Sequence, residues 1–399
     1  MLRERTFQTT IIQNHWFMIR TRMSHLDLSF VFPCLDERET LEACIREVQS
    51  SLDARDIAYE VVVADNGSVD GSQQIARDAG ARVCDVPKRG YGAALQGGIA
   101  AARGRYVMFA DADGSYLLEH AGSLYDTTVA ADADMGIASR TRGVIEPGAM
   151  PWLHRTLGTP VLTFLINLLF RASFSDCNSG FRCLRTSAVR AWDVRANGME
   201  FASELLIKAT KANASVVEIP SGLRPDKRSR APHLHTWRDG MRHLLFILSE
   251  RPELFELVGL AFVALTTILQ TFAIVLGPVE LAGMHIFDYH SQLLLLMIGC
   301  VGLQFYLLSF YLYFSGEEAP SRITRSLLGI DEAHLFFLLV FLVLCVFGGG
   351  AYMVFDWAQR DFQEVDLVNL MVFVTHLLCM LGFSGAGLLG IHMYKKRRM

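Results

Sequence analysis

The sequence predicts an α/β protein in which a doubly wound, Rossmann-like domain is followed by a four-helix transmembrane domain. Three observations support this prediction. Between residues 24 and 232, apolar runs alternate with helical stretches, as in doubly wound domains. Between residues 256 and 394, four apolar segments are long enough to span a bilayer. Only 20% of the 399 residues are charged, below the value of about a quarter that is usual for soluble proteins.

The first domain divides into predicted strands and helices in alternation. Continuous apolar runs are typical of strands buried on both faces of a parallel sheet, and they lie at 29–32, 60–64, 81–86, 106–110 and 135–138. Helical stretches lie between them, at 39–51, 72–79, 91–102 and 119–130. Ligands of such sheets bind at the carboxyl ends of the strands. We therefore expect a site in the residues that follow Phe32, Ala64 and Ala110.

The transmembrane segments predict an orientation. They are expected at 257–277, 291–316, 335–355 and 367–394. Basic residues fall before the first span, between the second and third spans (Arg322 and Arg325), and in the tail at 395–399. Because Lys and Arg remain on the cytoplasmic side, we expect an integral protein of the plasma (inner) membrane. Both termini and the whole first domain would then be cytoplasmic.

Two further regions are predicted to lie at the membrane surface. Residues 152–170 place leucines on a helical pattern between Arg155 and Arg171, and residues 233–255 lead into the first span. Helices of this kind lie in the plane of the interface. Packing of residues 161–170 on the sheet is the alternative for the first region. Residues 1–23 lack the uninterrupted apolar stretch of a signal peptide and are expected to form a flexible extension.

Composition excludes several classes of function. The eight cysteines form no Cys-x-x-Cys pair and are expected to be reduced. A formal net charge of −4 gives no indication of nucleic-acid binding. The Gly90-x-Gly92-x-x-Leu95 stretch lacks the third glycine of a dinucleotide fingerprint and does not directly follow a strand, so we exclude a Rossmann cofactor site.

The expected strand ends are rich in carboxylates. Asp36 and Glu37 follow the first strand, Asp65 follows the second, and Asp111 and Asp113 follow the strand at 106–110. Like charges gathered at one sheet edge are costly unless a cation or hydrogen-bond donors offset them. Two aspartates one residue apart can present oxygens to one Mg²⁺ or Mn²⁺ ion, which bridges to phosphate oxygens of a substrate. The sequence therefore predicts a metal site at this edge.

Further motifs accompany these carboxylates along the first domain. In chain order, the motifs are Pro33-Cys34-Leu35-Asp36-Glu37, Asp65-Asn66-Gly67-Ser68-Val69-Asp70-Gly71, Asp111-Ala112-Asp113, Ser139-Arg140, Arg155 with Thr159, Asp176 to Arg182, and Arg224 with Ser229 and Arg230. Over residues 27–250 they resemble the motifs of family 2 glycosyltransferases with a GT-A fold. The resemblance is to the branch of polyprenyl-phosphate glycosyl synthases, similar to dolichyl-phosphate mannose or glucose synthases.

The resemblance implies roles for individual residues. It implies donor binding by Pro33, Leu35, Glu37, Asp65, Asn66, Asp111, Arg224 and Arg230, metal binding by Asp111, Asp113 and Ser115, acceptor-phosphate binding by Arg140, Arg155 and Thr159, and catalytic roles for Asp113, Asp176 and Arg140. Arginine suits the phosphate positions because its planar fork matches phosphate oxygens. Asp176 is either a general base or a hydrogen-bonding group near the acceptor, and Glu204 is a further acid that could orient sugar hydroxyls.

The resemblance also implies the reaction. A sugar would pass from a nucleotide-sugar donor to a polyprenyl phosphate of the undecaprenyl or dolichyl type, with inversion and with Mg²⁺ or Mn²⁺. A UDP-sugar is the favoured donor and GDP-mannose the alternative. The acceptor phosphate is largely dianionic at neutral pH, so its oxygen needs no strong base. The expected partners are therefore the donor, the lipid and the membrane.

Three competing hypotheses predict other features. A processive polysaccharide synthase would carry a Gln-x-x-Arg-Trp motif, which the sequence lacks. A transporter or flippase with a nucleotide-binding regulatory domain would need many polar groups within its spans, and these spans contain few, such as Gln304 and His376. A catalytically inactive scaffold would not need the Asp111 and Asp113 pair. We expect the spans to act as an anchor or as the contact surface of a homo-oligomer.

Overall fold

The computed structural model describes residues 26–229, 236–281, 284–316, 318–359 and 368–398. It divides the chain into two compact units, one up to Ile247 and one from Leu248 onward. The predicted extension at 1–23 and the predicted donor residue Arg230 lie outside the described residues.

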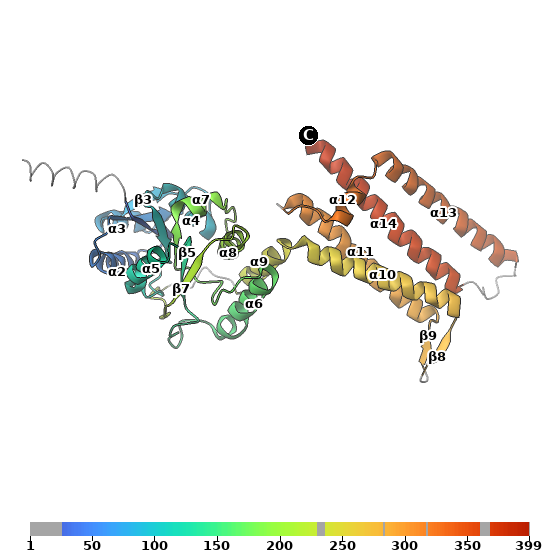
Figure 1. The fold of residues 1–399 in the computed structure, drawn as a ribbon, viewed down its shortest axis with the longest axis horizontal. Coiled ribbons are helices and arrows are strands. Elements are labelled where there is room, and N and C mark those ends of the chain that lie inside the picture. The colour runs from blue at the N-terminus through green and yellow to red at the C-terminus, as the bar shows by residue number, and fades with distance from the viewer. Residues whose placement is uncertain (1–25, 230–235, 282–283, 317, 360–367, 399) are drawn as a thin grey trace, which may run out of the picture. The chain divides into compact units, whose positions relative to one another are not determined.

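The first unit is built on a seven-stranded sheet with the order β3-β2-β1-β4-β6-β5-β7 (Figure 1). The strands are β1 (Leu28–Cys34), β2 (Tyr59–Asp65), β3 (Arg82–Asp85), β4 (Tyr106–Phe109), β5 (Met135–Ser139), β6 (Arg182–Arg185) and β7 (Val216–Pro220). β1 pairs in parallel with both β2 and β4, whereas β6 is antiparallel to its neighbours β4 and β5. The chain therefore winds outward in opposite directions from β1. Such a switch point is where doubly wound sheets bind their ligands.

Helices cover both faces of this sheet. On one face, α2 (Leu41–Asp53), α3 (Ser72–Asp78) and α5 (Ala121–Ala130) pack on an apolar core that includes Phe30 and Phe32 of β1. On the other face, a second core joins the sheet to five helices. These are α4 (Tyr91–Ala101), α6 (Thr159–Phe170), α7 (Thr186–Ala191), α8 (Phe201–Lys211) and α9 (Thr236–Ser249). Alternate side chains of the buried strands feed the two cores, which explains their continuous apolar sequences.

The structure confirms the predicted doubly wound α/β domain, with one correction to the direction of its strands. All predicted strands and helices of the first unit are present, with boundaries that shift by up to two residues. The predicted helix at 119–130 begins with a 3-10 turn, η1 (Leu118–His120), and the one at 152–170 contains a wide π-helical turn, η2 (His154–Gly158), before α6. The sheet is mixed, not wholly parallel, because β6 enters between β4 and β5 in the antiparallel direction.

The predicted interfacial regions have apolar surfaces. One face of α6 buries Leu162 and Ile166 in the core against the sheet, as the alternative prediction of packing on the sheet has it. Its other face and η2 leave Leu157, Phe164 and Leu168 more than half exposed. α9 likewise buries Ile247, while Trp237 and Leu245 are exposed. The predicted region at 233–255 is thus divided between α9 and the first turn of the next helix.

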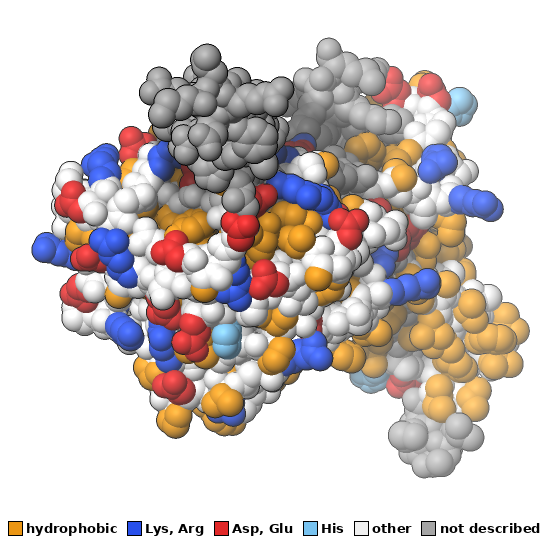
Figure 2. All heavy atoms as spheres, turned by 60° about the vertical axis from the view of Figure 1, so that its left-hand side comes forward, with side chains coloured by type: hydrophobic (Ala, Val, Ile, Leu, Met, Phe, Trp, Pro, Cys, Tyr) orange, Lys and Arg blue, Asp and Glu red, His pale blue; other side chains and the backbone are white. Residues whose placement is uncertain are grey.

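Among the described residues of the second unit, four helices are long and apolar enough to cross a membrane. They are α10 (Pro252–Leu276), α11 (Tyr289–Ser315), α13 (Glu332–Gln359) and α14 (Val368–Arg398). A short hairpin of β8 (Val279–Leu281) and β9 (Met284–Ile286) joins α10 to α11, and α12 (Arg322–Leu328) precedes α13. In Figure 2 the part of this unit in view carries mainly hydrophobic side chains. The predicted four spans therefore correspond to four helices of suitable length and composition.

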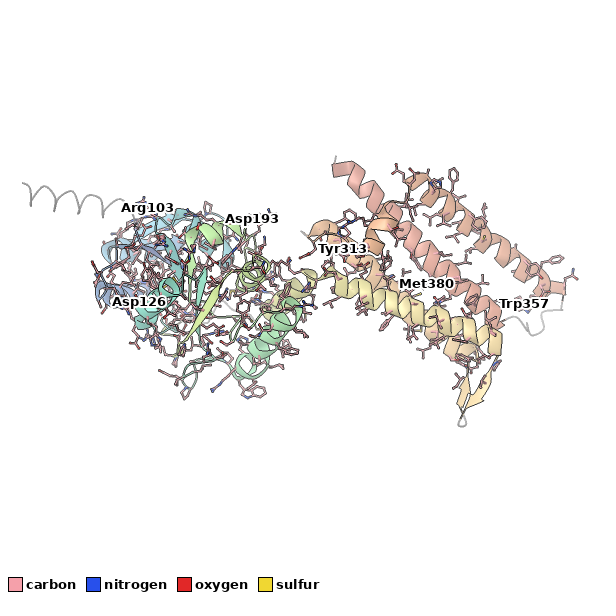
Figure 3. The ribbon with its side chains drawn as sticks, viewed as in Figure 1. Arg103, Asp126, Asp193, Tyr313, Trp357 and Met380 are labelled. Atoms are coloured by element: carbon pink, nitrogen blue, oxygen red, sulfur yellow. The ribbon has the colours of Figure 1, made fainter. Side chains whose placement is uncertain are left out.

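One carboxylate is buried among these helices. Glu256 of α10 accepts hydrogen bonds from the Tyr313 hydroxyl of α11 at 2.8 Å and from the Thr324 hydroxyl of α12 at 2.8 Å. Ser321, which precedes α12, also donates to Glu256. Tyr313, labelled in Figure 3, lies near the end of α11. These bonds fasten the starts of α10 and α12 to the end of α11.

Candidate active site

The loops that follow β1 and β2 are fastened to each other. The Asp36 amide donates to the Ser68 hydroxyl at 2.9 Å, and the Val69 amide donates to the Asp36 carboxylate at 2.7 Å. A third bond joins the Arg38 amide to the Asp70 carboxylate at 2.9 Å. Asp36 takes a left-handed conformation with φ of 58°, which Asp tolerates better than most residues. Two motifs that are separate in the sequence thus form one wall of the site.

Asp65 and Asn66 organise this wall from within. The Asp65 carboxylate is 2% exposed and accepts hydrogen bonds from the Gly67 amide, the Ser68 amide and the Gln73 side chain. Asn66 donates to the carbonyls at 86 and 88 and accepts from the Gly90 amide. The predicted donor contacts of both residues stay predictions. Their visible role is to fix the loops at the ends of β2 and β3.

Asp111 follows β4 in buried surroundings. Its carboxylate accepts a 2.8 Å hydrogen bond from the Tyr91 hydroxyl. Burial, and then the negative charge of Asp113, raise the pKa of Asp111 to about 7, while Arg140 and Arg228 act in the opposite direction. Burial and a neighbouring like charge both make the ionised form of Asp111 costly. A cation bound there would relieve that cost.

Gly180 allows this packing around Asp111. A Cβ atom at this position would lie 3.0 Å from Asp111 Oδ2 and 3.1 Å from the hydroxyls of Tyr91 and Tyr116. The Gly180 amide also donates to the Tyr116 hydroxyl at 2.6 Å. The close approach of three polar side chains therefore favours glycine at this position of the Asp176 to Arg182 motif, because a Cβ atom would force them to shift by a few tenths of an ångström.

Asp113 lies two residues further along the same loop. Its Oδ1 accepts from the Ser115 amide at 2.9 Å, and its Oδ2 accepts from Arg228 at 3.1 Å. Arg228 also donates to Glu37 at 3.3 Å. The structure thus brings together three predicted site residues, Glu37, Asp113 and Ser115, and adds Arg228, which was not predicted.

Arg224 approaches the same loop from the segment after β7. Its Nε donates to the Gly114 carbonyl at 2.7 Å, and its Nη2 pairs with Glu47 at 2.5 Å. The predicted donor residue Arg224 thus shapes the loop between Asp113 and Ser115. Pro33 and Leu35 are partly buried where β1 ends, next to the wall described above.

Arg140 and Asp176 form a buried ion pair, and the Arg140 charge acts on Asp111. Asp176 is fully buried and also accepts the backbone amides of Arg140 and Asn178. Burial alone would raise the pKa of Asp176, but the Arg140 charge and these hydrogen bonds lower it. A carboxylate that is so fully bonded is better suited to orienting Arg140 than to accepting a proton.

The predicted acceptor-phosphate residues lie at η2 and the start of α6. Thr159 is buried, and its hydroxyl accepts from the Asn178 amide group at 3.4 Å. Arg155 is exposed. Burial, and then the charge of Arg140, lower the pKa of His154, which places that charge close to η2. The predicted acceptor residues therefore lie around Asp176 and η2, with Arg155 on the outer surface.

Glu204, the other candidate acid, is occupied by structural contacts. It is 4% exposed and accepts hydrogen bonds from the amides of Arg195 and Ala196. Lys208 pairs with it at 3.5 Å. These contacts fix the segment whose carbonyls pack on Gly90 and Gly92 at the start of α4.

The carboxylates at the end of β4 are suitable ligands for a hard divalent cation. Asp111 and Asp113 offer carboxylate oxygens, which Mg²⁺ and Mn²⁺ accept together with water and substrate phosphates. Within the described ranges, no group of three or more His, Cys, Asp or Glu residues is placed to hold a metal. An ion held by this pair would therefore need phosphate or water oxygens to complete its coordination.

Arg228, Tyr91 and Gly180 are the residues that sequence reasoning missed. Arg228 was hidden in a run of charges, because Asp226, Lys227 and Arg230 surround it. Gly180 lies inside the Asp176 to Arg182 motif, and its backbone does not adopt the positive φ that would by itself favour glycine. Only the proximity of Asp111, Tyr91 and Tyr116 reveals its role.

The fold and the site define a glycosyltransferase with a GT-A-like sheet. The family description "Glycosyl transferase family 2" matches residues 29–192. The low-salt glycan biosynthesis hexosyltransferase Agl6 of Haloferax volcanii is 31% identical over 377 residues, covering 91% of this chain and 89% of that protein. The chain therefore belongs to glycosyl transferase family 2.

Two further similar proteins match a smaller share of the chain. The uncharacterized glycosyltransferase Rv0539 of Mycobacterium tuberculosis is 29% identical, over 50% of this chain and 85% of its own. Among solved structures, glucosyl-3-phosphoglycerate synthase from M. tuberculosis in complex with phosphoglyceric acid has a TM-score of 0.46 at 20% identity. That likeness covers 57% of this chain and 81% of that one.

Proposed function

We propose that this glycosyltransferase moves a sugar from a nucleotide-sugar donor to a polyprenyl phosphate in the membrane, with inversion and with Mg²⁺ or Mn²⁺. A UDP-hexose is the favoured donor and GDP-mannose the alternative. The relative Agl6 is named as a hexosyltransferase of glycan biosynthesis, which supports a hexose as the transferred sugar. The observation that carries the proposal is the position of Asp111 beside Asp113, within reach of the positive charges of both Arg140 and Arg228.

The two arginines divide the site into a donor side and an acceptor side. On the donor side, Asp111 and Asp113 would hold the metal, while Glu37, Asp65 and Asn66 would frame the nucleotide. These proposed roles are supported by the hydrogen bonds of Asp36, Ser68 and Arg228, which join the loops that carry these residues. The bound metal would neutralise the leaving nucleoside diphosphate.

On the acceptor side, Arg140, Thr159 and Arg155 would receive the lipid phosphate. Arg140 is held in one orientation by Asp176, so its remaining donors are fixed in space. Prior orientation of this kind lowers the entropic cost of bringing two anionic substrates together. The acceptor oxygen is already largely ionised at neutral pH, which agrees with an Asp176 that is bonded and not free to act as a base.

The surfaces around this side suit a lipid substrate. η2 and α6 expose Leu157, Phe164 and Leu168, and an exposed apolar face is expected to enter the headgroup boundary of a bilayer. The four apolar helices of the second unit support membrane insertion. The distribution of Lys and Arg in the loops supports a cytoplasmic first unit and cytoplasmic termini.

The direct test is a lipid-labelling assay with the full chain. Purified protein would be given undecaprenyl phosphate, Mn²⁺ or Mg²⁺ and a panel of radiolabelled nucleotide sugars, and label extracted into organic solvent would be counted. We expect labelling from one donor that requires the metal and is lost in Asp113→Ala. A folded protein that binds nucleotide but labels no lipid from any donor would overturn the proposed acceptor.

A further inference from the structure

Arg228 lies among the carboxylates of the donor site. Its Nη2 donates to Asp113 Oδ2 at 3.1 Å and to Asp226 Oδ2 at 3.1 Å, and its Nη1 donates to Glu37 Oε1 at 3.3 Å. Its side chain is only 12% exposed. A single guanidinium therefore joins the loop after β1, the loop after β4 and the segment after β7.

The same carboxylate oxygen cannot serve Arg228 and a metal equally well. Asp113 Oδ2 accepts the guanidinium hydrogen bond, and Asp113 is one of the two residues placed to hold the divalent ion. Two cations that approach one oxygen repel each other and compete for its lone pairs. A metal ion that arrives alone would have to displace Arg228 from Asp113.

Arg228 has capacity to bind a further acceptor. Its Nε atom is buried and finds no hydrogen-bond partner among the residues that the structure describes. A buried donor of this kind is costly, because it has lost its water without replacement. An oxygen of a bound phosphate would satisfy it, and the planar fork of arginine matches phosphate geometry.

The backbone on both sides of Arg228 is held in place. The Lys227 amide donates to the Asp113 carbonyl at 3.1 Å, and the Ser229 amide donates to Glu39 at 2.7 Å. Release of the carboxylates by Arg228 therefore requires a rotation of its side chain and no displacement of the segment.

We propose that Arg228 neutralises the carboxylates of the donor site while that site is empty. The metal and the diphosphate of the donor then take over this role when they bind. In the empty site its guanidinium neutralises Asp113 and Glu37. When a nucleoside diphosphate enters with the metal, the guanidinium leaves Asp113 and donates to phosphate oxygens. This inference rests on the proposed metal-dependent donor binding, and its consequence is that metal and diphosphate bind together far better than the metal alone.

The test measures Mn²⁺ binding to the full chain in detergent by electron paramagnetic resonance, with and without UDP or GDP. For the wild type we expect weak Mn²⁺ binding that a nucleoside diphosphate strengthens strongly. In Arg228→Gln, Mn²⁺ alone should bind more tightly by about tenfold, within the usual range of coupling between two ligands. The strengthening by the diphosphate should fall, because the variant has lost a phosphate donor.

Two further variants test whether the effect on Mn²⁺ binding depends on the position and the shape of the charged group at Arg228. Arg46→Gln removes the same charge from the surface of α2, where Arg46 is 57% exposed, and should bind Mn²⁺ as the wild type does. Arg228→Lys keeps a positive charge without the fork, so it should keep the weak binding of Mn²⁺ alone but lose part of the gain from the diphosphate. Thermal unfolding of each variant would test whether the first unit remains folded.

The outcomes are distinct. Equal Mn²⁺ affinity of Arg228→Gln and the wild type, in a protein whose Mn²⁺ binding is strengthened by UDP or GDP, would overturn this role of Arg228 and leave the proposed function standing. A wild type that binds neither Mn²⁺ nor a nucleoside diphosphate would overturn metal-dependent donor binding itself, and the exchange with it.

Discussion

Arg140 holds Asp176 in a two-pronged ion pair, with Nε 2.7 Å from Oδ2 and Nη2 2.8 Å from Oδ1. The Asp176 side chain is 0% exposed and the Arg140 side chain 12% exposed. Bidentate pairs of this kind fix the plane of the guanidinium as well as its position. The relationship explains how one arginine can offer its remaining donors to a ligand in a constant orientation.

Breaking this pair should affect both stability and transfer. In Asp176→Asn, the buried Arg140 charge loses its partner, so we expect a loss of about 3 kcal/mol in unfolding free energy and a lower rate of lipid labelling. The pH dependence of the remaining activity should keep the acid limb of the wild type. Disappearance of that limb would instead identify Asp176 as the base.

A methyl group at Gly180 should disturb the metal-binding loop. Gly180→Ala places a Cβ atom against Asp111, Tyr91 and Tyr116, and overpacking of this kind costs about 1–3 kcal/mol. We expect weaker Mn²⁺-dependent nucleotide binding, measured by calorimetry. Gly240→Ala is the control, because nothing lies within 4 Å of its added Cβ. Equal binding by both variants would contradict the role given to Gly180.

The apolar face of η2 and α6 should matter for the lipid and not for the donor. In Phe164→Ser combined with Leu168→Ser, two side chains that are at least 60% exposed lose their apolar surface. We expect the KM for polyprenyl phosphate in vesicles to rise about tenfold, with unchanged nucleotide binding. Val144→Ser, at a residue 77% exposed, is the matched control. An unchanged KM in the double variant would exclude membrane contact by this face.

His243 should make the first unit sensitive to mild acid. Its Nδ1 lies 2.7 Å from the Ser203 hydroxyl, and burial lowers the pKa of His243 from 6.5 to about 4, against the opposite effect of Glu200 and Asp239. Between these values the unfolded chain binds a proton that the folded chain does not, so stability falls as the pH falls from 6.5 to 4.

The contribution of His243 can be measured by difference. We expect a loss of at most about 3 kcal/mol over this range, seen as a falling unfolding temperature. His243→Asn, which can still bond to Ser203, should show a shallower pH dependence. Parallel curves for the variant and the wild type would show that other groups cause the change.

Glu256 should hold the starts of α10 and α12 to the end of α11. In Glu256→Gln, the amide nitrogen cannot accept a hydrogen bond, so at least one of the donors Tyr313, Ser321 and Thr324 loses its acceptor. Loss of a bond to a charged group costs about 1.5–3 kcal/mol. Thermal unfolding of the full chain in detergent should therefore begin at a lower temperature, with nucleotide binding by the first unit retained below that temperature. No change in unfolding would show that these bonds contribute nothing.

The parts of the fold that were predicted share a physical cause. β1, β2 and β4 are buried on both faces, so their sequences are continuous apolar runs, and the carboxylates after them were readily placed at one edge. β6 and β7 escaped prediction because charged residues interrupt them. Arg182 of β6 is fully buried, and its guanidinium donates to the carbonyls of Cys177 and Ala202. No local pattern distinguishes such an arginine from an exposed one.

The same limit applies to the site. Asp111 and Asp113 were predicted from their place after a strand, whereas the partner of Asp113 is 115 residues away in the sequence. Which of several neighbouring charges turns inward depends on contacts that the local sequence does not contain. Arg228 could be identified only from the folded chain.

The segment after β7 also sets when the donor site can be completed during synthesis. Arg228 joins Glu37 across 191 residues, and Arg224 joins Glu47 across 177 residues. Loops of this length close late, because their ends must meet before the contacts can repay the lost chain entropy. As the ribosome releases the chain, the loops after β1 and β4 emerge well before the arginines that complete them. Nucleotide binding would thus be acquired only when nearly the whole first unit has left the ribosome, and a nascent chain that stops before residue 228 could have most of the sheet without this activity.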